Sequence, residues 1–196
     1  MEIKKVKSRQ PIPQNAKRVF KGVIFDVYQW EQEMYDGSKA TFERLKRPDS
    51  AMVFPILPDG RIILASQEQP DKDLFLGLIG GRVEVGEDAI TAAKRELLEE
   101  TGYTANEFIL WSKSSPVGKV DSTFYTFIAK GIKKVANQNL DAGEKIDLKL
   151  FTFDEFLNLA NDEDFVEREK EVVLKILQAK LYPEKMVELK KLFSPK

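Results

Sequence analysis

The most informative stretch of this sequence is residues 81–103, which read GRVEVGEDAITAAKRELLEETGY. After a glycine-rich start, small and apolar residues recur at helical spacing, and a set of glutamates recurs on a second face. Asp88 is a favourable N-terminal capping residue, and Gly102 is a typical C-terminal stop. The stretch therefore predicts a glycine-rich loop followed by one amphipathic helix between Asp88 and Gly102.

Three acidic residues, Glu96, Glu99 and Glu100, cluster on this predicted helix. Side chains three and four positions apart share a helix face, so their negative charges lie close together. Such a cluster is most often a solvated acidic surface. It can also hold hard cations such as Mg²⁺ or Mn²⁺, which prefer carboxylate oxygens, with a diphosphate as the natural second partner. Spacing alone leaves both interpretations open.

The order of residues in this stretch resembles the catalytic box of the Nudix hydrolase superfamily, G-x5-E-x7-R-E-U-x-E-E-x-G-U, where U is a bulky aliphatic residue. The seven fixed positions all match, at Gly81, Glu87, Arg95, Glu96, Glu99, Glu100 and Gly102. Leu97 satisfies the first aliphatic position, and only Tyr103 departs from the second. A chance match has odds of about 10⁻⁸ per register, which outweighs the interpretation as a solvated surface.

The resemblance implies an α+β fold, a Nudix-type α/β/α sandwich with a mixed sheet. It also implies Mg²⁺, or Mn²⁺, as cofactor. The implied metal ligands are the backbone carbonyl of Gly80 and the side chains of Glu96, Glu99 and Glu100. Glu99, Glu100 and Arg95 would also count among the catalytic residues, with Arg95 orienting a carboxylate, and Glu87 would brace the loop.

Strand-like and turn-like residues alternate before this box. The strand-like runs, rich in β-branched and aromatic residues, are 18–30, 40–45, 51–57 and 61–65. The turn sequence Asp36-Gly37-Ser38 lies between the first two runs, and Pro58-Asp59-Gly60 lies between the last two. We therefore expect an N-terminal antiparallel sheet and, between residues 51 and 65, a second hairpin.

Further strands are expected after the box at 107–111, 122–129 and 146–153, and the chain from Asp154 onward has helical character. Amphipathic helices are predicted at 165–180 and 184–193, separated by Tyr182-Pro183, because proline interrupts a continuous helix.

The chain has 196 residues, enough for one well-buried core and too few for two ordinary domains. We expect an N-terminal arm and sheet over residues 1–48, which would contribute to dimerisation and the substrate pocket. A catalytic core would follow over 49–160, and C-terminal helices over 161–196 would pack on the core or on a partner. The lysine-rich residues 1–10 are expected to form a mobile arm.

Composition excludes several classes of chemistry. The chain has no cysteine and no histidine, which excludes thiol catalysis, imidazole acid–base chemistry and the usual zinc sites. The formal net charge is −1 with dispersed lysines, so no nucleic-acid partner is expected. No apolar run is long enough to span a membrane and no signal peptide is recognisable, so a soluble, cytoplasmic protein is expected.

The layout before the box resembles one branch of the family, the ADP-ribose pyrophosphatases and nucleoside diphosphate sugar hydrolases. In that branch the N-terminal sheet is typically shared within a homodimer, which we expect here. Ser115-Pro116 partly matches a serine-proline-glycine stretch of the branch. Asp121-Ser122 lacks the second residue of an acidic pair, and Gln67-Glu68-Gln69 matches a Gln-aromatic-Arg segment only at Gln67, a candidate substrate contact.

Other candidate site residues lie outside the box. Glu144, in the loop Asp141-Ala142-Gly143-Glu144, resembles a late acidic position of the branch and is a candidate catalytic base or further metal ligand, with a surface turn as the alternative. Aromatic residues that could stack on a nucleobase are Trp30, Phe25 and Tyr28, for which core or interface packing is the alternative. Arg44 or Arg47 could reach a phosphate or the partner subunit.

These observations favour a Mg²⁺-dependent pyrophosphohydrolase that cleaves ADP-ribose or a nucleotide sugar into two phosphate monoesters. Two alternatives remain: a nucleoside triphosphate pyrophosphohydrolase, which would release pyrophosphate, and a non-catalytic nucleotide-binding sensor. The intact glutamates of the box argue against the sensor.

Overall fold

The computed structural model describes residues 11–70, 72–115 and 118–195. Residues 1–10, expected to form a mobile arm, and Pro116 lie outside this range. The strands are β1 (Lys17–Lys21), β2 (Asp26–Glu33), β3 (Lys39–Lys46), β4 (Ser50–Pro55), β5 (Ile62–Gln69), β6 (Lys72–Gly77), β7 (Ile79–Arg82), β8 (Tyr103–Ser114), β9 (Val120–Asp121), β10 (Phe124–Lys134) and β11 (Lys145–Phe151). The helices are α1 (Ala89–Thr101), α2 (Phe153–Asn158), the 3₁₀ turn η1 (Leu159–Asn161), α3 (Glu163–Arg168), α4 (Lys170–Leu181) and α5 (Pro183–Phe193).

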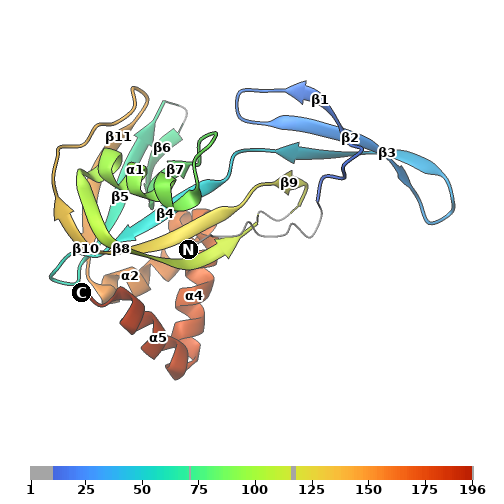
Figure 1. The fold of residues 1–196 in the computed structure, drawn as a ribbon. Helices are drawn as coiled ribbons and strands as arrows, with labels where there is room; N and C mark the ends of the chain where they lie inside the picture. Colours follow the sequence, from blue (N-terminus) through green and yellow to red (C-terminus); the bar gives the residue numbers. More distant parts are fainter. Residues whose placement is uncertain (1–10, 71, 116–117, 196) are drawn as a thin grey trace.

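Two sheets form the centre of the molecule, with helices on both sides (Figure 1). The first is mixed, in the order β7-β4-β10-β8, with β4 and β10 parallel; the second has the order β11-β5-β6 and is antiparallel. Helix α1 lies on one side, and α2, α4 and α5 lie on the other. This arrangement is the predicted α/β/α sandwich.

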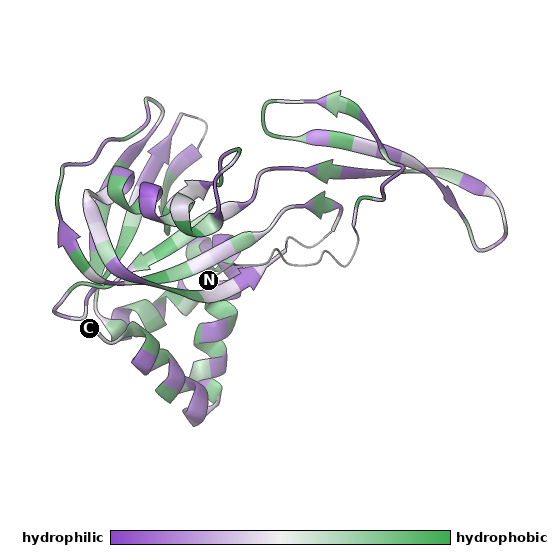
Figure 2. Ribbon diagram, in the orientation of Figure 1, coloured by the Kyte–Doolittle hydropathy of each residue, from purple (hydrophilic) through white to green (hydrophobic). Residues whose placement is uncertain are grey.

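Strand β4 shows why the sandwich forms. Ala51 and Val53 belong to the apolar cluster beneath α1, whereas Phe54 belongs to the cluster beneath the C-terminal helices. Alternate side chains of a strand point to opposite faces, so the continuous apolar run 51–55 of β4 is buried on both sides. Figure 2 shows this concentration of hydrophobic residues in the central strands.

The C-terminal helices are held by an aromatic cluster. Phe193 of α5 stacks on Phe156 of α2 with ring centroids 4.8 Å apart, and it meets Phe54 and Trp111 edge to face. Aromatic pairs in these geometries stabilise beyond the area they bury. The last helix is therefore part of the core. Among the described residues, none of the helices is both long and apolar enough to cross a membrane.

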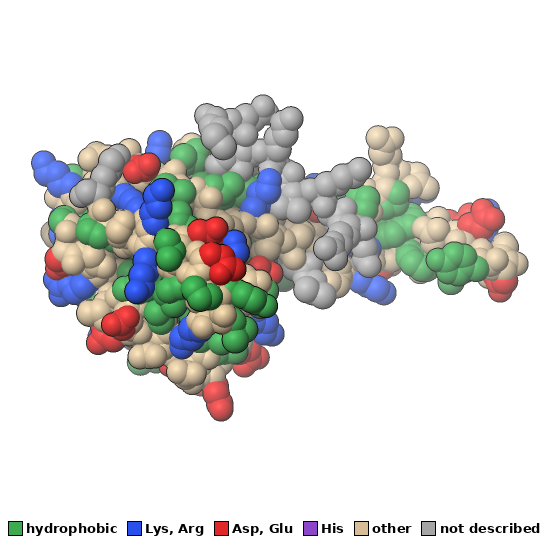
Figure 3. Space-filling view, turned by 90° about the horizontal axis from the view of Figure 1, so that it is seen from below, with side chains coloured by type: hydrophobic (Ala, Val, Ile, Leu, Met, Phe, Trp, Pro, Cys, Tyr) green, Lys and Arg blue, Asp and Glu red, His purple; other side chains and the backbone are tan. Residues whose placement is uncertain are grey.

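Strands β1, β2 and β3, with β9, form a separate sheet that projects from the sandwich, and we call β1–β3 the arm (Figure 1). The N-terminal antiparallel sheet was predicted correctly, although a hairpin around Gly22 divides the expected run 18–30 into two strands. Figure 3 shows hydrophobic side chains gathered on the surface of this projection. Around the β1–β2 hairpin, Val23 is 95% exposed and Phe20 is 59% exposed.

The predicted hairpin between residues 51 and 65 was wrong. The turn at Pro58-Asp59-Gly60 forms, with Leu57 N donating to Arg61 O at 2.8 Å, and one bridge joins Ile56 to Ile62. Beyond that bridge, β4 and β5 separate into different sheets. Residues 51–55 of β4 and 62–65 of β5 are apolar and almost all buried, and each strand pairs with other partners in the centre of the molecule.

The predicted helix 165–180 is also interrupted. Glu169 has φ −112° and ψ 42°, which ends α3 and starts α4, although no proline or glycine marks the break. The predicted break before Pro183 is confirmed, because that residue opens α5. The expected strand 146–153 ends at Phe151, since Thr152 caps α2 through a capping box with Glu155.

Candidate functional site

Helix α1 has the caps that the sequence predicts. The Asp88 side chain accepts a hydrogen bond from Thr91 N at 2.8 Å, and Gly102, with φ 74°, donates its N–H to Leu98 O at 2.8 Å. These caps fix where the helix begins and ends. The alanines and Leu97 of α1 are buried against the sheets. The glutamates near the C-terminal end of this helix therefore lie beside β7.

Two glycines of β7 lie where a side chain would not fit, one against β4 and one against α1. Gly80 N donates to Glu100 Oε2 at 2.9 Å, and a Cβ at Gly80, where φ is 138°, would overlap with Ala51 O. A Cβ at Gly81 would lie 2.5 Å from Glu96 Oε1. A side chain at Gly80 would therefore clash with backbone, and one at Gly81 would displace a carboxylate of the site.

Arg95 ties the acidic residues together. Its Nη1 donates to Glu96 Oε1 at 2.8 Å and to Glu99 Oε2 at 3.0 Å, and its Nη2 donates to Glu87 Oε2 at 3.2 Å. Nη2 also donates to Arg82 O at 2.9 Å. Glu87 in turn accepts from Glu84 N, so it spans the loop as expected. Arg95 thus supplies positive charge to the cluster and links the helix to the glycine loop.

Glu100 is the most deeply buried carboxyl of the cluster, at 3% exposure. Burial raises the pKa of Glu100 to about 8, opposed by the hydrogen bond from Gly80, with the negative charges of Glu96 and Glu144 adding to the rise. Burial also raises the pKa of Glu96. A cation would offset both effects, since opposite charge favours the ionised form.

A polar cavity of about 350 Å³ collects these groups. Its acidic lining residues are Glu84, Glu96, Glu99, Glu100, Asp141 and Glu144. The late acidic loop predicted to supply Glu144 therefore reaches the same cavity as the box. The oxygen-rich donor set suits a hard divalent cation. Among the described residues no three acidic side chains are already grouped as metal ligands, and Glu96 and Glu99 are hydrogen-bonded to Arg95.

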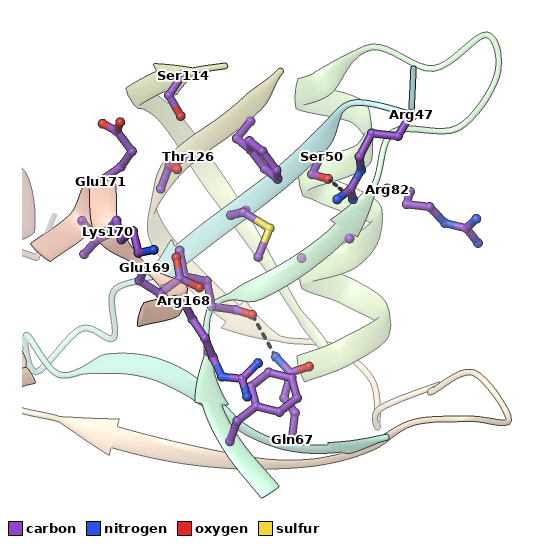
Figure 4. Close-up of a pocket in the computed structure, with 18 of the residues that line it drawn as sticks. Arg47, Ser50, Gln67, Arg82, Ser114, Thr126, Arg168, Glu169, Lys170 and Glu171 are labelled. Carbon is purple, nitrogen blue, oxygen red and sulfur yellow. Dashed lines mark hydrogen bonds between the residues drawn. The ribbon is translucent and has the colours of Figure 1, made fainter. Parts of the chain in front are cut away.

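A second, less polar cavity of about 520 Å³ adjoins the first, and Arg47, Gln67, Gly80 and Gly81 line both. Figure 4 shows its lining, drawn from several elements. Phe75 of β6 carries the guanidinium of Arg168 over its ring, 4.2 Å from the centroid. Ser114 and Thr126 contribute hydroxyl groups from β8 and β10. The size of the space is that of a small-molecule site.

The backbone of Leu78, which lines the larger cavity, is held by side chains from two other segments. Gln67 Nε2 donates to Leu78 O at 3.0 Å, and the carboxylate of Glu169 accepts a hydrogen bond from the Leu78 backbone. Burial raises the pKa of Glu169 to about 7, opposed by this hydrogen bond and by Arg168. Gln67 and Glu169 therefore both hold the backbone of Leu78, which lies two residues before Gly80.

The other predicted substrate residues lie on or beside the arm. Phe25, Tyr28 and Trp30 lie at or within β2, and Arg44 lies on β3 with its guanidinium 5.7 Å from the centre of the Trp30 ring. None of the four lines either cavity. Their contact with substrate stays a prediction, whereas Gln67 lines both cavities.

Sequence reasoning missed part of the cavity lining. Phe75, Arg168 and Glu169 were not singled out, and Arg47 was mentioned only as an alternative to Arg44. The missed residues come from β6 and from the break between α3 and α4. A helix break without proline or glycine has no local signal, so the approach of Arg168 to Phe75 could not be read from spacing.

Comparison with known proteins accounts for this geometry. Residues 46–175 match the NUDIX domain, which covers most of the chain and includes both the box and the break at Glu169. The chain belongs to the Nudix family. It is therefore a Nudix hydrolase, and the acidic cavity contains the catalytic box of the family, which generally requires a divalent metal.

Curated relatives share most of the length of this Nudix chain. The ADP-ribose pyrophosphatase of Bacillus subtilis is 28% identical over 167 residues, which cover 83% of this chain and 90% of that protein. The methanol dehydrogenase activator of Bacillus methanolicus shows the same identity and coverage. A crystal structure of an ADP compounds hydrolase is similar with a TM-score of 0.70 and 26% identity, covering 90% of this chain and 97% of that one.

Proposed function

We propose that this Nudix hydrolase cleaves the diphosphate of ADP-ribose or of a related nucleotide sugar. The main support is the pair of adjoining cavities: the acidic one suits a cation and a diphosphate, and the larger one has room for a group attached to it. The names of the similar proteins, an ADP-ribose pyrophosphatase and an ADP compounds hydrolase, point the same way.

The proposed cofactor is Mg²⁺, with Mn²⁺ as the substitute. Glu96, Glu99, Glu100 and the carbonyl of Gly80 would hold it, because a hard cation prefers oxygen ligands. When bound, such an ion neutralises diphosphate charge and polarises the phosphorus under attack. Arg95 would keep the glutamates positioned while the cation takes over part of its role as their counter-charge.

Glu144 is our proposed base. Among the described residues it makes no ion pair, and its Oε2 accepts only from Asp141 N at 3.3 Å, so it can accept a proton. A water molecule would attack one phosphorus and pass its proton to Glu144 while the bond from that phosphorus to the bridging oxygen breaks. The products are two phosphate monoesters, which for ADP-ribose are AMP and ribose 5-phosphate.

The direct test is a substrate panel with product analysis. ADP-ribose, nucleotide sugars and nucleoside triphosphates are incubated with Mg²⁺, with Mn²⁺ and with EDTA. We expect two phosphate monoesters from one or more of the diphosphate-linked compounds and no turnover in EDTA. Release of pyrophosphate from triphosphates alone would support the triphosphate alternative, and ligand binding without any hydrolysis would support the sensor.

The arm supports a further proposal, a homodimer formed through the N-terminal sheet. Phe20, Val23 and Ile24 lie exposed and close together in sequence around the β1–β2 hairpin, where an isolated chain would leave apolar surface in water. Light scattering coupled to gel filtration should give twice the mass of 22.4 kDa. The Val23→Asp variant should elute as a monomer, and a wild-type monomer at all concentrations would contradict the proposal.

A further inference from the structure

The connection between β10 and β11, residues 135–144, passes the C-terminal end of α1 (Figure 1). It brings Glu144 to the acidic cavity, which the glutamates of the box line from the helix. The carboxylates of the cavity therefore come from two segments that are far apart in the sequence. The distance between Glu144 and the box depends on what joins the connection to the helix.

Backbone hydrogen bonds join the two segments at the end of the helix. Val135 N and Ala136 N both donate to Gly102 O, at 2.9 Å and 3.1 Å. Asn139 N donates to Glu99 O at 2.8 Å. The last carbonyls of a helix have no partner within the helix, so a segment that supplies donors there caps it. The connection thus caps the turn of α1 that carries the catalytic glutamates.

The side chain of Gln138 makes the strongest link between these elements. Its Nε2 donates to Glu100 O at 2.7 Å and to Ile146 O at 3.0 Å. An amide nitrogen has two hydrogens, so these two bonds use both of them. One acceptor belongs to α1, and the other belongs to the second residue of β11. Gln138 therefore joins the connection, the helix and the strand at one atom.

This link closes the base of the turn that carries Glu144. Gln138 and Ile146 lie on either side of the turn in the sequence, and within it Glu144 N donates to Asp141 O at 3.0 Å. Leu140 packs against the apolar cluster beneath α1. The negative charge of Glu144 raises the pKa of Glu100, which shows that the two carboxylates act on each other. A change at the base of the turn would alter their separation.

We infer that Gln138 is a positioning residue that fixes the Glu144 carboxylate relative to the glutamates of the box. This inference rests on the proposed function, which gives Glu144 its role as base. Gln138 lines neither cavity, so it acts through Glu144 and not by touching substrate. Its loss should therefore affect the chemical step more than substrate binding. Misplacement of a reacting group by about 1 Å can cost about 100-fold in rate.

Variants of Gln138 separate its donors from its bulk. Gln138→Met keeps the length of the side chain and removes both donors. We expect it to lower kcat for the best diphosphate substrate by about 10- to 100-fold and to change KM by less than about threefold. Gln138→Lys keeps a donor on a flexible stem and should recover part of the loss. A wild-type kcat in Gln138→Met, or a rise in KM alone, would overturn the inference.

Gln178→Met is the matched control, because Gln178 lies on α4 and lines neither cavity. It should have wild-type kinetics.

A double-mutant cycle tests whether Gln138 acts through Glu144. In the Glu144→Gln background the base is already lost, so adding Gln138→Met should change kcat by less than about twofold. A purely structural role would lower kcat by the same factor in both backgrounds, which would overturn the inference. A wild-type kcat in Glu144→Gln would remove the proposed base and this inference with it.

Hydrogen–deuterium exchange measured by mass spectrometry gives a readout that needs no turnover. We expect the amides of residues 139–146 to exchange about 2- to 10-fold faster in Gln138→Met than in wild type, with residues 89–95 of α1 unchanged. Unchanged exchange at 139–146 would overturn the inference. If wild type hydrolyses nothing in the substrate panel, the proposed function fails and exchange alone decides whether Gln138 holds the turn. If wild type is active and Gln138→Met matches it in rate and exchange, only the assignment of Gln138 fails.

Discussion

The catalytic loop and helix, residues 79–102, and the arm differ in how many of their side chains find partners within the same segment. In the loop and helix, both caps, the Arg95 network and the contact from Gly80 to Glu100 are made within that segment. The arm forms its sheet but leaves apolar side chains exposed, among them Phe20 and Val23. Short-range contacts thus set the geometry of the box, whereas the contacts within the arm leave part of its apolar surface exposed.

The largest effect should come from Glu100, the buried carboxylate of the catalytic segment. Glu100→Gln removes the proposed ligand but leaves an oxygen that can accept from Gly80, so the fold should persist. We expect kcat to fall by about 10³-fold or more with an unchanged circular dichroism spectrum. Glu188→Gln, on the exposed face of α5, is the control, and a wild-type rate in Glu100→Gln would contradict the assignment.

A smaller effect tests whether the close approach of β7 to β4 requires glycine at position 80. Gly80→Ala places a Cβ against the backbone of Ala51 with φ 138°, so we expect a loss of about 2–3 kcal/mol in the free energy of unfolding. Gly86→Ala shares a positive φ, 84°, but meets nothing within 4 Å and should lose about 1 kcal/mol. Urea unfolding measures both, and equal losses would show that backbone conformation alone explains the requirement.

Glu169 tests the contribution of the C-terminal segment to the same loop. Burial raises its pKa from the ordinary glutamate value of 4.5 to about 7 in the folded chain, so the folded state binds more protons than the unfolded state between these values. Wild-type stability should therefore fall as pH rises from 4.5 to 7 and stay low above it. Relative to wild type, Glu169→Gln should gain about 1–3 kcal/mol between pH 4.5 and pH 8. A difference independent of pH, in urea unfolding, would contradict this.

The smallest effect is expected on the arm. Phe20→Ser replaces an exposed side chain and should change the unfolding free energy of the dilute chain by less than about 0.5 kcal/mol. Phe54→Ala, in the aromatic cluster, should lose about 3–5 kcal/mol in the same measurement. A large loss of unfolding free energy in Phe20→Ser would mean that Phe20 packs against other residues of the same chain.

The sequence predicted the features that depend on near neighbours. The ends of α1, the glutamate cluster and the break before Pro183 follow from capping, spacing and proline geometry. It did not predict that β4 and β5 would separate, because the turn at Pro58-Asp59-Gly60 serves a hairpin and a change of sheet equally well. It also did not predict that Arg168 would meet Phe75, since residues more than ninety positions apart are joined only by tertiary packing.

The bond from Arg47 N to Asp121 O joins the base of the arm to the strand that leads into β10. Arg47 also lines both cavities, so a ligand that fills them and contacts Arg47 would act on the residue at the base of the arm. Thermodynamic reciprocity then requires that whatever fixes the arm, including a second copy of the chain, changes affinity for the ligand by the same factor. Quaternary assembly and substrate capture would be two readouts of one equilibrium.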